Sequence, residues 1–375
     1  MIPMRVYFDN SATTKMAPEV LDAMMPFMTS EYGNPSSIHY LGNTAAAALR
    51  NSRKQVADSL GCLPSEITFT SGGTESDNIA LMGTMLSSGK KRIVTSAIEH
   101  PAVLETCAAL RRYGFDVTLL GVDRNGFVDP AELDSVLGDD VCLVSVMAAN
   151  NVIGTMQNIS ELAKVTHDHG VLFHTDAVQG YTKMDINVKR DRIDLLSLSG
   201  HKIHGPKGIG AVFVRTGVSI GPIMFGGGQE SGLRSSTENV PGIVGLGKAA
   251  EVAMCTMKTD IQHMTKLRDE IIEDTLSLPG AHLNGPVENR LCNNAHFRFD
   301  GVKGTDLILA LSRKGIAAST ASACSAGSVE PSHVLTAIGL SLEESISALR
   351  ISLSRYNTEE EVSYLDAVLP SIIRR

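Results

Sequence analysis

The sequence lacks the features of a membrane-spanning or disulfide-stabilised secreted protein. Its 375 residues contain no run that approaches eighteen apolar residues, and the opening segment MIPMRVYFDNSATT carries Arg5 where a signal peptide needs an apolar stretch. The six cysteines form no C-x-x-C pair, which is typical of reduced thiols in a chain of this size. We therefore expect a cytoplasmic protein with no membrane contact.

An excess of positive charge is also missing. Lys and Arg number 33 against 41 Asp and Glu, so the formal net charge is −8. A protein that binds nucleic acid needs a basic field to hold the phosphate groups. We therefore expect no nucleic-acid ligand.

Nucleotide-loop and metal-site patterns fail as well. The glycines before Lys90 have the wrong spacing for a Walker loop, and Gly208 and Gly210 are followed by Phe213 where G-x-G-x-x-G needs its third glycine. A zinc site would have to draw on three histidines without a Cys or carboxylate at a recognised spacing: His174, His201 and His204. The sequence thus predicts no bound metal ion.

What the sequence does contain is an α/β alternation. Short apolar, β-branched runs are separated by amphipathic stretches such as 101–113 and 159–169, a pattern that predicts a mainly parallel sheet with helical crossovers. The predicted strands cover residues 92–97, 141–148, 171–177, 193–199 and 210–215.

The alternation stops near Val240, where a helical pattern longer than 25 residues begins at Gly242 and ends at Leu276. Such a helix can connect two domains. Strand-like and helical segments then follow at 293–299, 306–314, 348–354 and from Thr358 onward. This part predicts a smaller α+β domain.

A lysine and a carboxylate follow two of the predicted strands. Lys202 comes directly after the strand at 193–199, and Asp176 stands near the end of the strand at 171–177. Ligands of α/β sheets bind at strand ends, and pyridoxal phosphate needs both an amine for its aldehyde and an anion for its ring nitrogen. The alternatives are a solvated loop lysine and a capping aspartate.

Other segments add phosphate and proton chemistry. In TSGGTESDNIAL, Thr74 stands near a helix start, where free N–H groups suit a phosphate dianion, although an ordinary N-cap is the alternative. His100 follows a third strand and could lie on a planar ring and shuttle a proton, or serve structure alone.

A thiol and a guanidinium complete the candidates. Cys324 stands in AASTASACSAGSVEP, whose small residues favour an exposed thiol, with a loop cysteine of no function as the alternative. Arg350 could bind a substrate carboxylate through two parallel hydrogen bonds, or form a structural ion pair.

Taken together, these segments resemble the cysteine desulfurases, a branch of the class-V aminotransferases with the fold-type I architecture of pyridoxal-phosphate enzymes. The resemblance spans nearly the whole chain through YFDNSATT, YGNPSSIH, SGGTESDN, EHPAV, NNVIGT, HTDAVQG, SGHKIHGPKGIG, RSSTEN, ASACSAG and EPSHVL. It implies a large cofactor-binding α/β domain at 16–255 with a mainly parallel mixed sheet. Residues 1–15 and 256–375 would form the small α+β domain that carries Cys324.

The resemblance also implies a role for each site residue. Lys202 would bind the cofactor aldehyde, His100 would stack on the ring, Asp176 would pair with the ring nitrogen and Gln179 would reach the phenolic oxygen. The phosphate would be held by Gly73, Thr74, Ser199 and His201, and by Thr237 of a neighbouring subunit in a homodimer. Asn34, Asn151 and Arg350 would bind the substrate carboxylate, with Asn151 also near the cofactor.

The implied reaction removes sulfur from L-cysteine, leaving alanine and a persulfide on Cys324. The sulfur would pass to an acceptor protein such as an iron–sulfur scaffold, and Cys324 is a candidate transient cluster ligand. An aminotransferase or selenocysteine lyase would use the same cofactor residues, and a non-enzymatic sulfur or iron–sulfur carrier would use Cys324 alone. Cys324 discriminates against transamination, which needs no thiol nucleophile.

Overall fold

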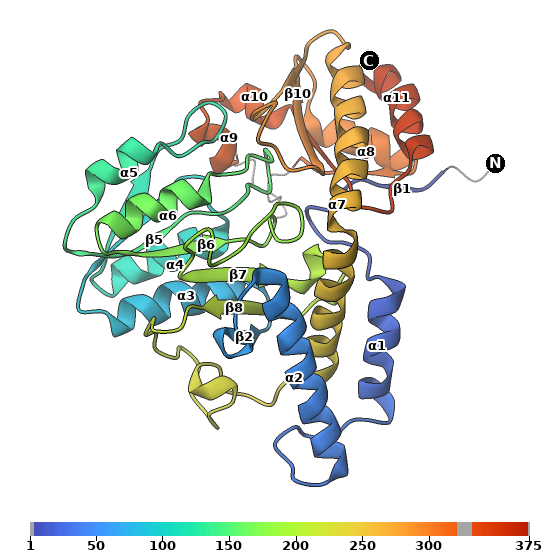
Figure 1. Ribbon diagram of the computed structural model, residues 1–375. Helices are drawn as coiled ribbons and strands as arrows, with labels where there is room; N and C mark the ends of the chain where they lie inside the picture. The colour runs from blue at the N-terminus through green and yellow to red at the C-terminus, as the bar shows by residue number, and fades with distance from the viewer. Residues whose placement is uncertain (1–3, 321–331, 374–375) are drawn as a thin grey trace.

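The computed structural model describes residues 4–320 and 332–373. A twisted sheet covered by helices makes up the larger part, and a long helix joins it to a smaller unit beside which both chain ends lie (Figure 1). Among the described residues the main sheet has seven strands in the order β2-β8-β7-β6-β5-β3-β4. The fold-type I architecture implied by the sequence therefore has its mixed, mainly parallel sheet.

Strand direction places five chain segments at one edge of this sheet. The pairs β3–β4, β3–β5, β5–β6 and β6–β7 are parallel, whereas β8 is antiparallel to both β7 and β2. The carboxyl ends of β2, β3, β5, β6 and β7 therefore lie at the same edge. The strands are β2 (Ile67–Thr70), β3 (Arg92–Ser96), β4 (Asp116–Leu120), β5 (Val141–Ser145), β6 (Leu172–Asp176), β7 (Leu195–Ser199) and β8 (Gly210–Val214).

Alternate residues of each strand contact helices on opposite faces of the sheet. In β3, Ile93 packs with the helices α3 and α4, whereas Val94 packs with the helices of the other face, and Leu195 and Leu196 divide in the same way. Successive side chains of a strand point to opposite faces, so burial on both sides gives the continuous apolar runs in the sequence. The helices are α1 (Pro18–Thr29), α2 (Tyr40–Leu60), α3 (Gly73–Ser87), α4 (Pro101–Arg112), α5 (Pro130–Val136) and α6 (Ile159–Asp168).

The smaller unit has its own core. The antiparallel strands β9 (Ala281–Leu283), β10 (Asn294–Phe299) and β12 (Ala348–Ser352) pack with α8 (Gly304–Arg313) and α11 (Glu359–Ile373). The N-terminal strand β1 (Val6–Tyr7) pairs with β11 (Ile316–Ala317), so Val6 and Phe8 belong to this core. The short helices α9 (His333–Ala337) and α10 (Leu342–Ile346) complete the unit.

The helix α7 (Val240–Leu276) runs through both cores. Leu246 and Ala250 pack in the core of the main sheet, and Leu267 and Ile271 pack in the core of the smaller unit. This helix is long and apolar enough to cross a membrane by length and composition, but half of its most apolar window is buried inside the protein. We interpret α7 as a core helix, and the proposed domain boundary at 255/256 falls inside it.

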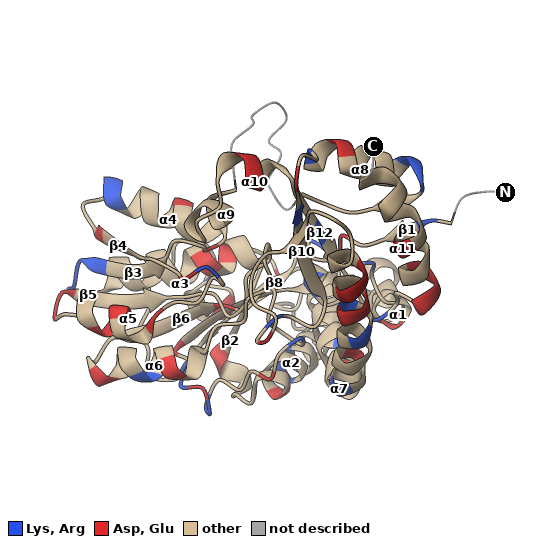
Figure 2. Ribbon diagram, turned by 90° about the horizontal axis from the view of Figure 1, so that it is seen from above, with Lys and Arg blue, Asp and Glu red and all other residues tan. Residues whose placement is uncertain are grey.

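Charged residues of both signs are interspersed over the elements. Figure 2 shows Lys and Arg beside Asp and Glu along the helices that surround the sheet. Where sequence and structure differ, the differences are local: β5 ends at Ser145 rather than at residue 148, and α1 and α2 occupy a part of the sequence for which no element was predicted.

Candidate active site

A cavity of about 230 Å³ lies at the edge of the sheet where the parallel strands end. Side chains that follow β3, β5, β6 and β7 reach it, together with the first residues of α3. It is lined by Gly73, Thr74, Asp77, His100, Met147, Asn151, Asp176, Val178, Gln179, Ser199, His201 and Lys202. Nine residues that the sequence singles out are thus brought together from segments up to 129 positions apart, Gly73 to Lys202.

Lys202 ends the 3-10 turn η2 (Gly200–Lys202), which directly follows β7. Its Nζ donates hydrogen bonds to the carbonyl oxygens of Ser11 at 2.5 Å and Ala12 at 2.7 Å. Burial lowers the pKa of Lys202 to about 8, and the charges of Arg350 and Lys183 act in the same direction. A substantial fraction of this amine is therefore neutral near physiological pH, which is the form that attacks a carbonyl.

Asp176 ends β6 and is 5% exposed. One of its carboxylate oxygens accepts the N–H of Val178 at 2.8 Å. Burial raises the pKa of Asp176, whereas the charges of His100 and Lys202 oppose that rise. Within the described ranges no basic side chain lies within the 4.0 Å ion-pair distance of this carboxylate. A ligand N–H or cation would supply the missing partner.

His100 is the N-cap residue of α4. Its Nδ1 accepts the N–H of Ala102 at 3.1 Å, so the proton of the neutral ring is assigned to Nε2. Burial lowers the pKa of His100, and the charge of Asp176 opposes this effect. The ring is thus held as a neutral donor at the cavity wall.

The start of α3 forms the opposite end of the cavity. No side chain caps this helix, and the N–H groups of its first turn have no carbonyl partner within the helix. Gly72 has a φ of 155°, a conformation that favours glycine, and a Cβ on Gly73 would lie 2.6 Å from Cγ2 of Val178. Glycine therefore leaves the helix start open to an anion.

Ser199 and His201 lie beside this helix start. Ser199 is buried, and Nδ1 of His201 lies 3.2 Å from Oγ1 of Thr13. Burial and the charge of Lys202 lower the pKa of His201 to about 4. A neutral His201 can donate one hydrogen bond to an anion without carrying a charge of its own.

Gln179 and Asn151 line the side wall. Nε2 of Gln179 donates to the carbonyl of Ser11 at 2.9 Å, but its buried Oε1 has no hydrogen-bond partner. The carbonyl of Asn151 accepts from Arg350 at 2.9 Å. An unpartnered buried amide oxygen is costly, and a ligand that donates a hydrogen bond would remove the cost.

Four of the predicted site residues do not line the cavity among the described residues. Arg350 is 4% exposed, binds Asp9 at 2.7 Å and contacts the cavity only through Asn151, while its Nε has no partner. Asn34 and Thr237 are exposed on loops. Cys324 lies outside the described residues.

Sequence analysis missed three lining residues, Asp77, Met147 and Val178. Asp77 is 1% exposed, its Oδ1 has no hydrogen-bond partner, and burial together with the charge of Asp176 raises its pKa well above the usual value. Its position three residues after Thr74 places it on the same helix face. That spacing was the available signal.

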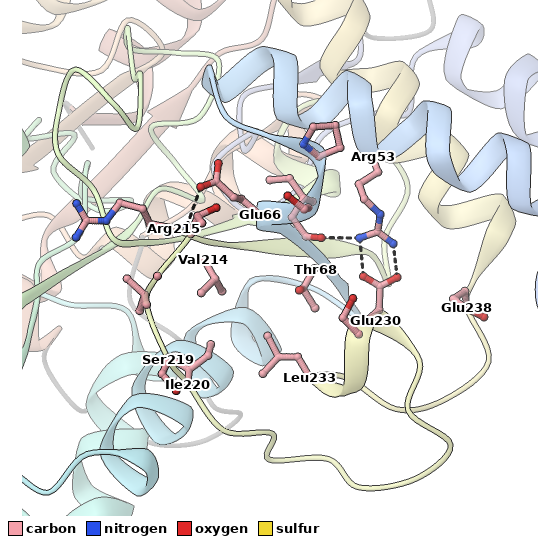
Figure 3. Close-up of a pocket in the computed structure, with 17 residues that line it drawn as sticks. Arg53, Glu66, Thr68, Val214, Arg215, Ser219, Ile220, Glu230, Leu233 and Glu238 are labelled. Carbon is pink, nitrogen blue, oxygen red and sulfur yellow. Dashed lines mark hydrogen bonds and ion pairs between the residues drawn. The ribbon is translucent and has the colours of Figure 1, made fainter.

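A larger cavity of about 730 Å³ lies elsewhere, along β2 and β8 (Figure 3). Figure 3 shows the guanidinium of Arg53 facing the carboxylate of Glu230, with an N–O distance of 2.6 Å. The same carboxylate accepts the N–H of Phe69 at 2.8 Å, and Glu66 accepts the N–H of Thr216 at 2.8 Å. These charges already have partners, so we do not assign the reaction to this cavity.

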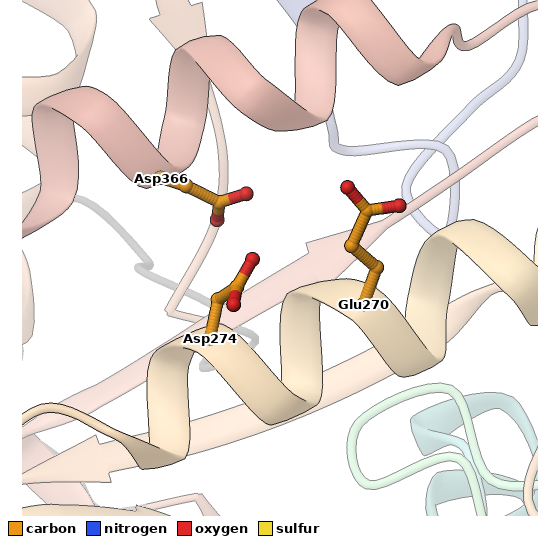
Figure 4. A group of neighbouring side chains, drawn as sticks. All are labelled: Glu270, Asp274 and Asp366. Atoms are coloured by element: carbon orange, nitrogen blue, oxygen red, sulfur yellow. The ribbon is translucent and has the colours of Figure 1, made fainter.

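A third group of interest lies between α7 and α11. Figure 4 shows the carboxylates of Glu270, Asp274 and Asp366 turned toward one another. Within the described part of the chain this is the group of acidic side chains close enough to share a cation. Carboxylates alone at a partly exposed surface are common without a metal ion, and we assign no ligand to them.

The chain belongs to the aminotransferase class-V family, whose description matches residues 6–365. A cysteine desulfurase IscS of Methanosarcina thermophila is 50% identical over 372 residues, covering 99% of this chain and 92% of that protein. One of Dictyoglomus turgidum is 46% identical over 373 residues, covering 99% and 95%. Within the family, the chain is therefore a cysteine desulfurase, as the sequence resemblance implied.

Solved structures agree with this assignment. A NifS-like protein superposes with a TM-score of 0.93 at 42% identity, covering 99% of this chain and 100% of that one. The structure described as SspA in complex with cysteine has a TM-score of 0.83 at 37% identity, covering 94% and 100%. These relatives confirm the fold-type I architecture. The family consists of enzymes that depend on pyridoxal phosphate.

Proposed function

We propose that this chain binds pyridoxal phosphate in the 230 Å³ cavity and uses it to remove sulfur from L-cysteine. One observation carries the proposal: a buried amine of lowered pKa, Lys202, and a buried carboxylate without a basic partner, Asp176, line the same small cavity. The uncapped start of α3 and the unpartnered Oε1 of Gln179 fit the phosphate and the phenolic oxygen of that cofactor.

Each residue of the cavity has a proposed task. Lys202 would bind the cofactor aldehyde, Asp176 would accept the ring N–H, and His100 would cover the ring face. The phosphate would contact Gly73 and Thr74 at the start of α3, together with Ser199 and His201. When bound, the cofactor supplies an electron sink that makes the α-hydrogen of an amino acid removable.

Proton transfer would fall to Lys202 and His100. Once the substrate amine has replaced it on the cofactor, the amine of Lys202 is free to remove the α-hydrogen, and its lowered pKa suits a base working near neutral pH. Nε2 of His100 carries the ring proton and can donate it to the departing sulfur.

The substrate carboxylate would bind near Arg350, Asn151 and Asn34. Arg350 is held by Asp9 and has its Nε free, so a substrate carboxylate would compete with the Asp9 carboxylate for the same guanidinium. A related structure, SspA in complex with cysteine, supports L-cysteine as the substrate.

Cys324 would be the nucleophile. Its thiolate would attack the substrate sulfur, forming the S–S bond of a persulfide as the C–S bond breaks, and the remaining fragment would become alanine. The persulfide sulfur would pass to an acceptor protein such as an iron–sulfur scaffold, in keeping with the IscS names of the relatives. The role as a transient cluster ligand remains part of this proposal.

We further propose a cytoplasmic homodimer with shared sites. Thr237 and Asn34 are exposed in the single chain rather than placed at its own cavity. That placement suits residues that complete the site of a neighbouring subunit, as the resemblance implies for Thr237.

The experiment that tests the proposed function is the visible spectrum of the purified protein during titration with L-cysteine, with alanine and sulfide measured in parallel. Yellow protein that responds to L-cysteine and releases alanine supports the proposal. Colourless protein that still carries sulfur would indicate a non-enzymatic carrier. Conversion of an amino acid and a keto acid without sulfide would indicate an aminotransferase, and a strong preference for selenocysteine would indicate a lyase.

A further inference from the structure

Lys183 is a buried lysine without an acidic partner. It is 8% exposed, and within the described ranges no carboxylate lies within 4.0 Å of its Nζ. Burial lowers its pKa to about 8. A buried cation of this kind costs free energy that a methionine of similar length would avoid, so its presence calls for a functional account.

The contacts of Lys183 lead to the candidate active site. Its Nζ donates to the carbonyl oxygen of Lys202 at 3.1 Å and to that of Gln179 at 3.4 Å. Both acceptors belong to residues that line the 230 Å³ cavity, but Lys183 itself does not line it. It lines a separate cavity of about 30 Å³, which Lys202 also borders. Lys183 therefore supports the Lys202 turn from the side away from the 230 Å³ cavity.

The backbone at Lys183 is held in a costly conformation. Thr182 has a φ of 64°, which is unfavourable for a β-branched residue. Hydrogen bonds from Tyr181 N to Ala177 O at 2.7 Å and from Lys183 N to Gly180 O at 2.9 Å fix the turn between β6 and Lys183. The surrounding structure thus determines where this ammonium lies.

The charge of Lys183 acts on several neighbours. It lowers the pKa of Lys202, after the larger effects of burial and Arg350, and it lowers the pKa of His201 and His204. Other ionisable groups act on Lys202 or Lys183, or border the small cavity: Asp176, Asp9, Arg350, Cys292, Asp260 and Arg355. A cation behind Lys202 favours the neutral amine in front of it.

We propose that Lys183 is a positioning residue for Lys202: its buried side chain fixes the turn that carries Lys202 and holds a positive charge behind the Lys202 amine. The inference rests on the proposed function, in which the neutral Lys202 amine binds the cofactor aldehyde and removes a proton.

The test is competitive acetylation of the full-length chain, freed of cofactor, across a pH series, with Lys202 modification measured by peptide mass spectrometry. In Lys183→Met the side-chain length is kept and the charge is lost. We expect the midpoint of Lys202 modification to move up by about one pH unit, from the Coulomb energy of one nearby charge. Lys183→Arg, which keeps the charge, should restore the wild-type midpoint.

Lys189→Met is the matched control, because it removes the same formal charge from an exposed site in the same segment. Equal Lys202 midpoints in wild type and Lys183→Met would overturn the inference. If neither Lys183 variant folds, the wild-type chain still decides: Lys183 modified as readily as Lys189 would contradict a buried positioning role. Failure of Lys202 to bind the cofactor would instead refute the proposed function.

Discussion

The two largest cavities compared here differ in how their charges are satisfied. In the 730 Å³ cavity, Arg53 and Glu230 form an ion pair, and hydrogen bonds from N–H groups lower the pKa of Glu66 although burial alone would raise it. In the 230 Å³ cavity the acid Asp176 has a raised pKa and the base Lys202 a lowered one. One cavity stabilises charges that already exist, and the other disfavours charges until a ligand arrives.

This difference shows why cavity volume is a poor guide to chemistry. A site that must bind a charged cofactor needs groups whose hydrogen-bonding capacity is not yet used, such as Oδ1 of Asp77 and Oε1 of Gln179. The larger cavity also contains one such atom, Oε2 of Glu238, but its other charges are paired. Substitutions in the two cavities should therefore have opposite consequences for activity and stability.

The largest effect is expected at Lys202. Lys202→Ala removes the amine that we assign to cofactor binding, so the protein should lose its yellow colour and about 1,000-fold or more of its alanine-forming activity. Lys207→Ala, an exposed lysine in the same loop, is the control and should keep both. A Lys202→Ala protein whose cofactor is still fixed to the chain by borohydride would show that another lysine does this work.

Cys324→Ser separates cofactor binding from sulfur transfer. Oxygen is a much poorer nucleophile than a thiolate toward the substrate sulfur, so alanine formation should fall about 100-fold or more. The spectrum should still change on addition of L-cysteine, because the cavity residues are unaltered. Undiminished production of alanine by this variant would eliminate Cys324 as the nucleophile.

A pair of isosteric substitutions tests the comparison of the two cavities directly. Asp176→Asn removes a buried carboxylate without a basic partner, so activity should fall about 100-fold while the free energy of unfolding is nearly unchanged. Glu230→Gln breaks a paired charge, so activity should stay within about twofold while the free energy of unfolding falls by roughly 2 kcal/mol. Enzyme assays and denaturant unfolding measure both quantities, and the reverse pattern would contradict our assignment.

The smallest effect is expected at Asp366. Burial first, then the hydrogen bond and charge of Asp274, raise the pKa of Asp366 from 3.8 to about 7. The folded protein therefore holds this proton more tightly than the unfolded chain, and the stability so gained is lost as the pH rises from about 4 to about 7.

Asp366→Asn should consequently raise the melting temperature at pH 8 by about 1–3 °C and change it little at pH 4. Thermal unfolding at the two pH values measures this. Asp139→Asn, at an exposed position, should show no such pH dependence. An equal shift at both pH values would indicate that packing rather than repulsion between carboxylates is involved.

Much of the fold is readable in the sequence, because parallel strands covered on both faces need continuous apolar runs. The runs at 193–199 and 171–177 therefore mark β7 and β6, and their ends mark Lys202 and Asp176. By contrast α2 has a low mean hydropathy and an Ala-rich stretch, so its helical pattern gives a weak signal.

Contacts between distant segments could not be predicted. Nothing in the sequence around Lys183 links it to Lys202, because the link is a hydrogen bond to a backbone carbonyl that every residue possesses. The partner of Arg350 was also open, and the structure places it on Asp9, 341 positions away. Asp77 was within reach of helix spacing alone.

The N-terminal segment has a consequence for the order in which the protein is made. The carbonyls of Ser11 and Ala12 hold the Lys202 amine, while Ser11 N binds Oγ of Ser352 at 2.8 Å and Asn10 binds the carbonyl of Ser352 at 2.9 Å. The sheet can form once its last strand leaves the ribosome, but these anchors belong to nearly the last residues synthesised. We therefore expect cofactor loading to be a late, post-translational event rather than an aid to early folding.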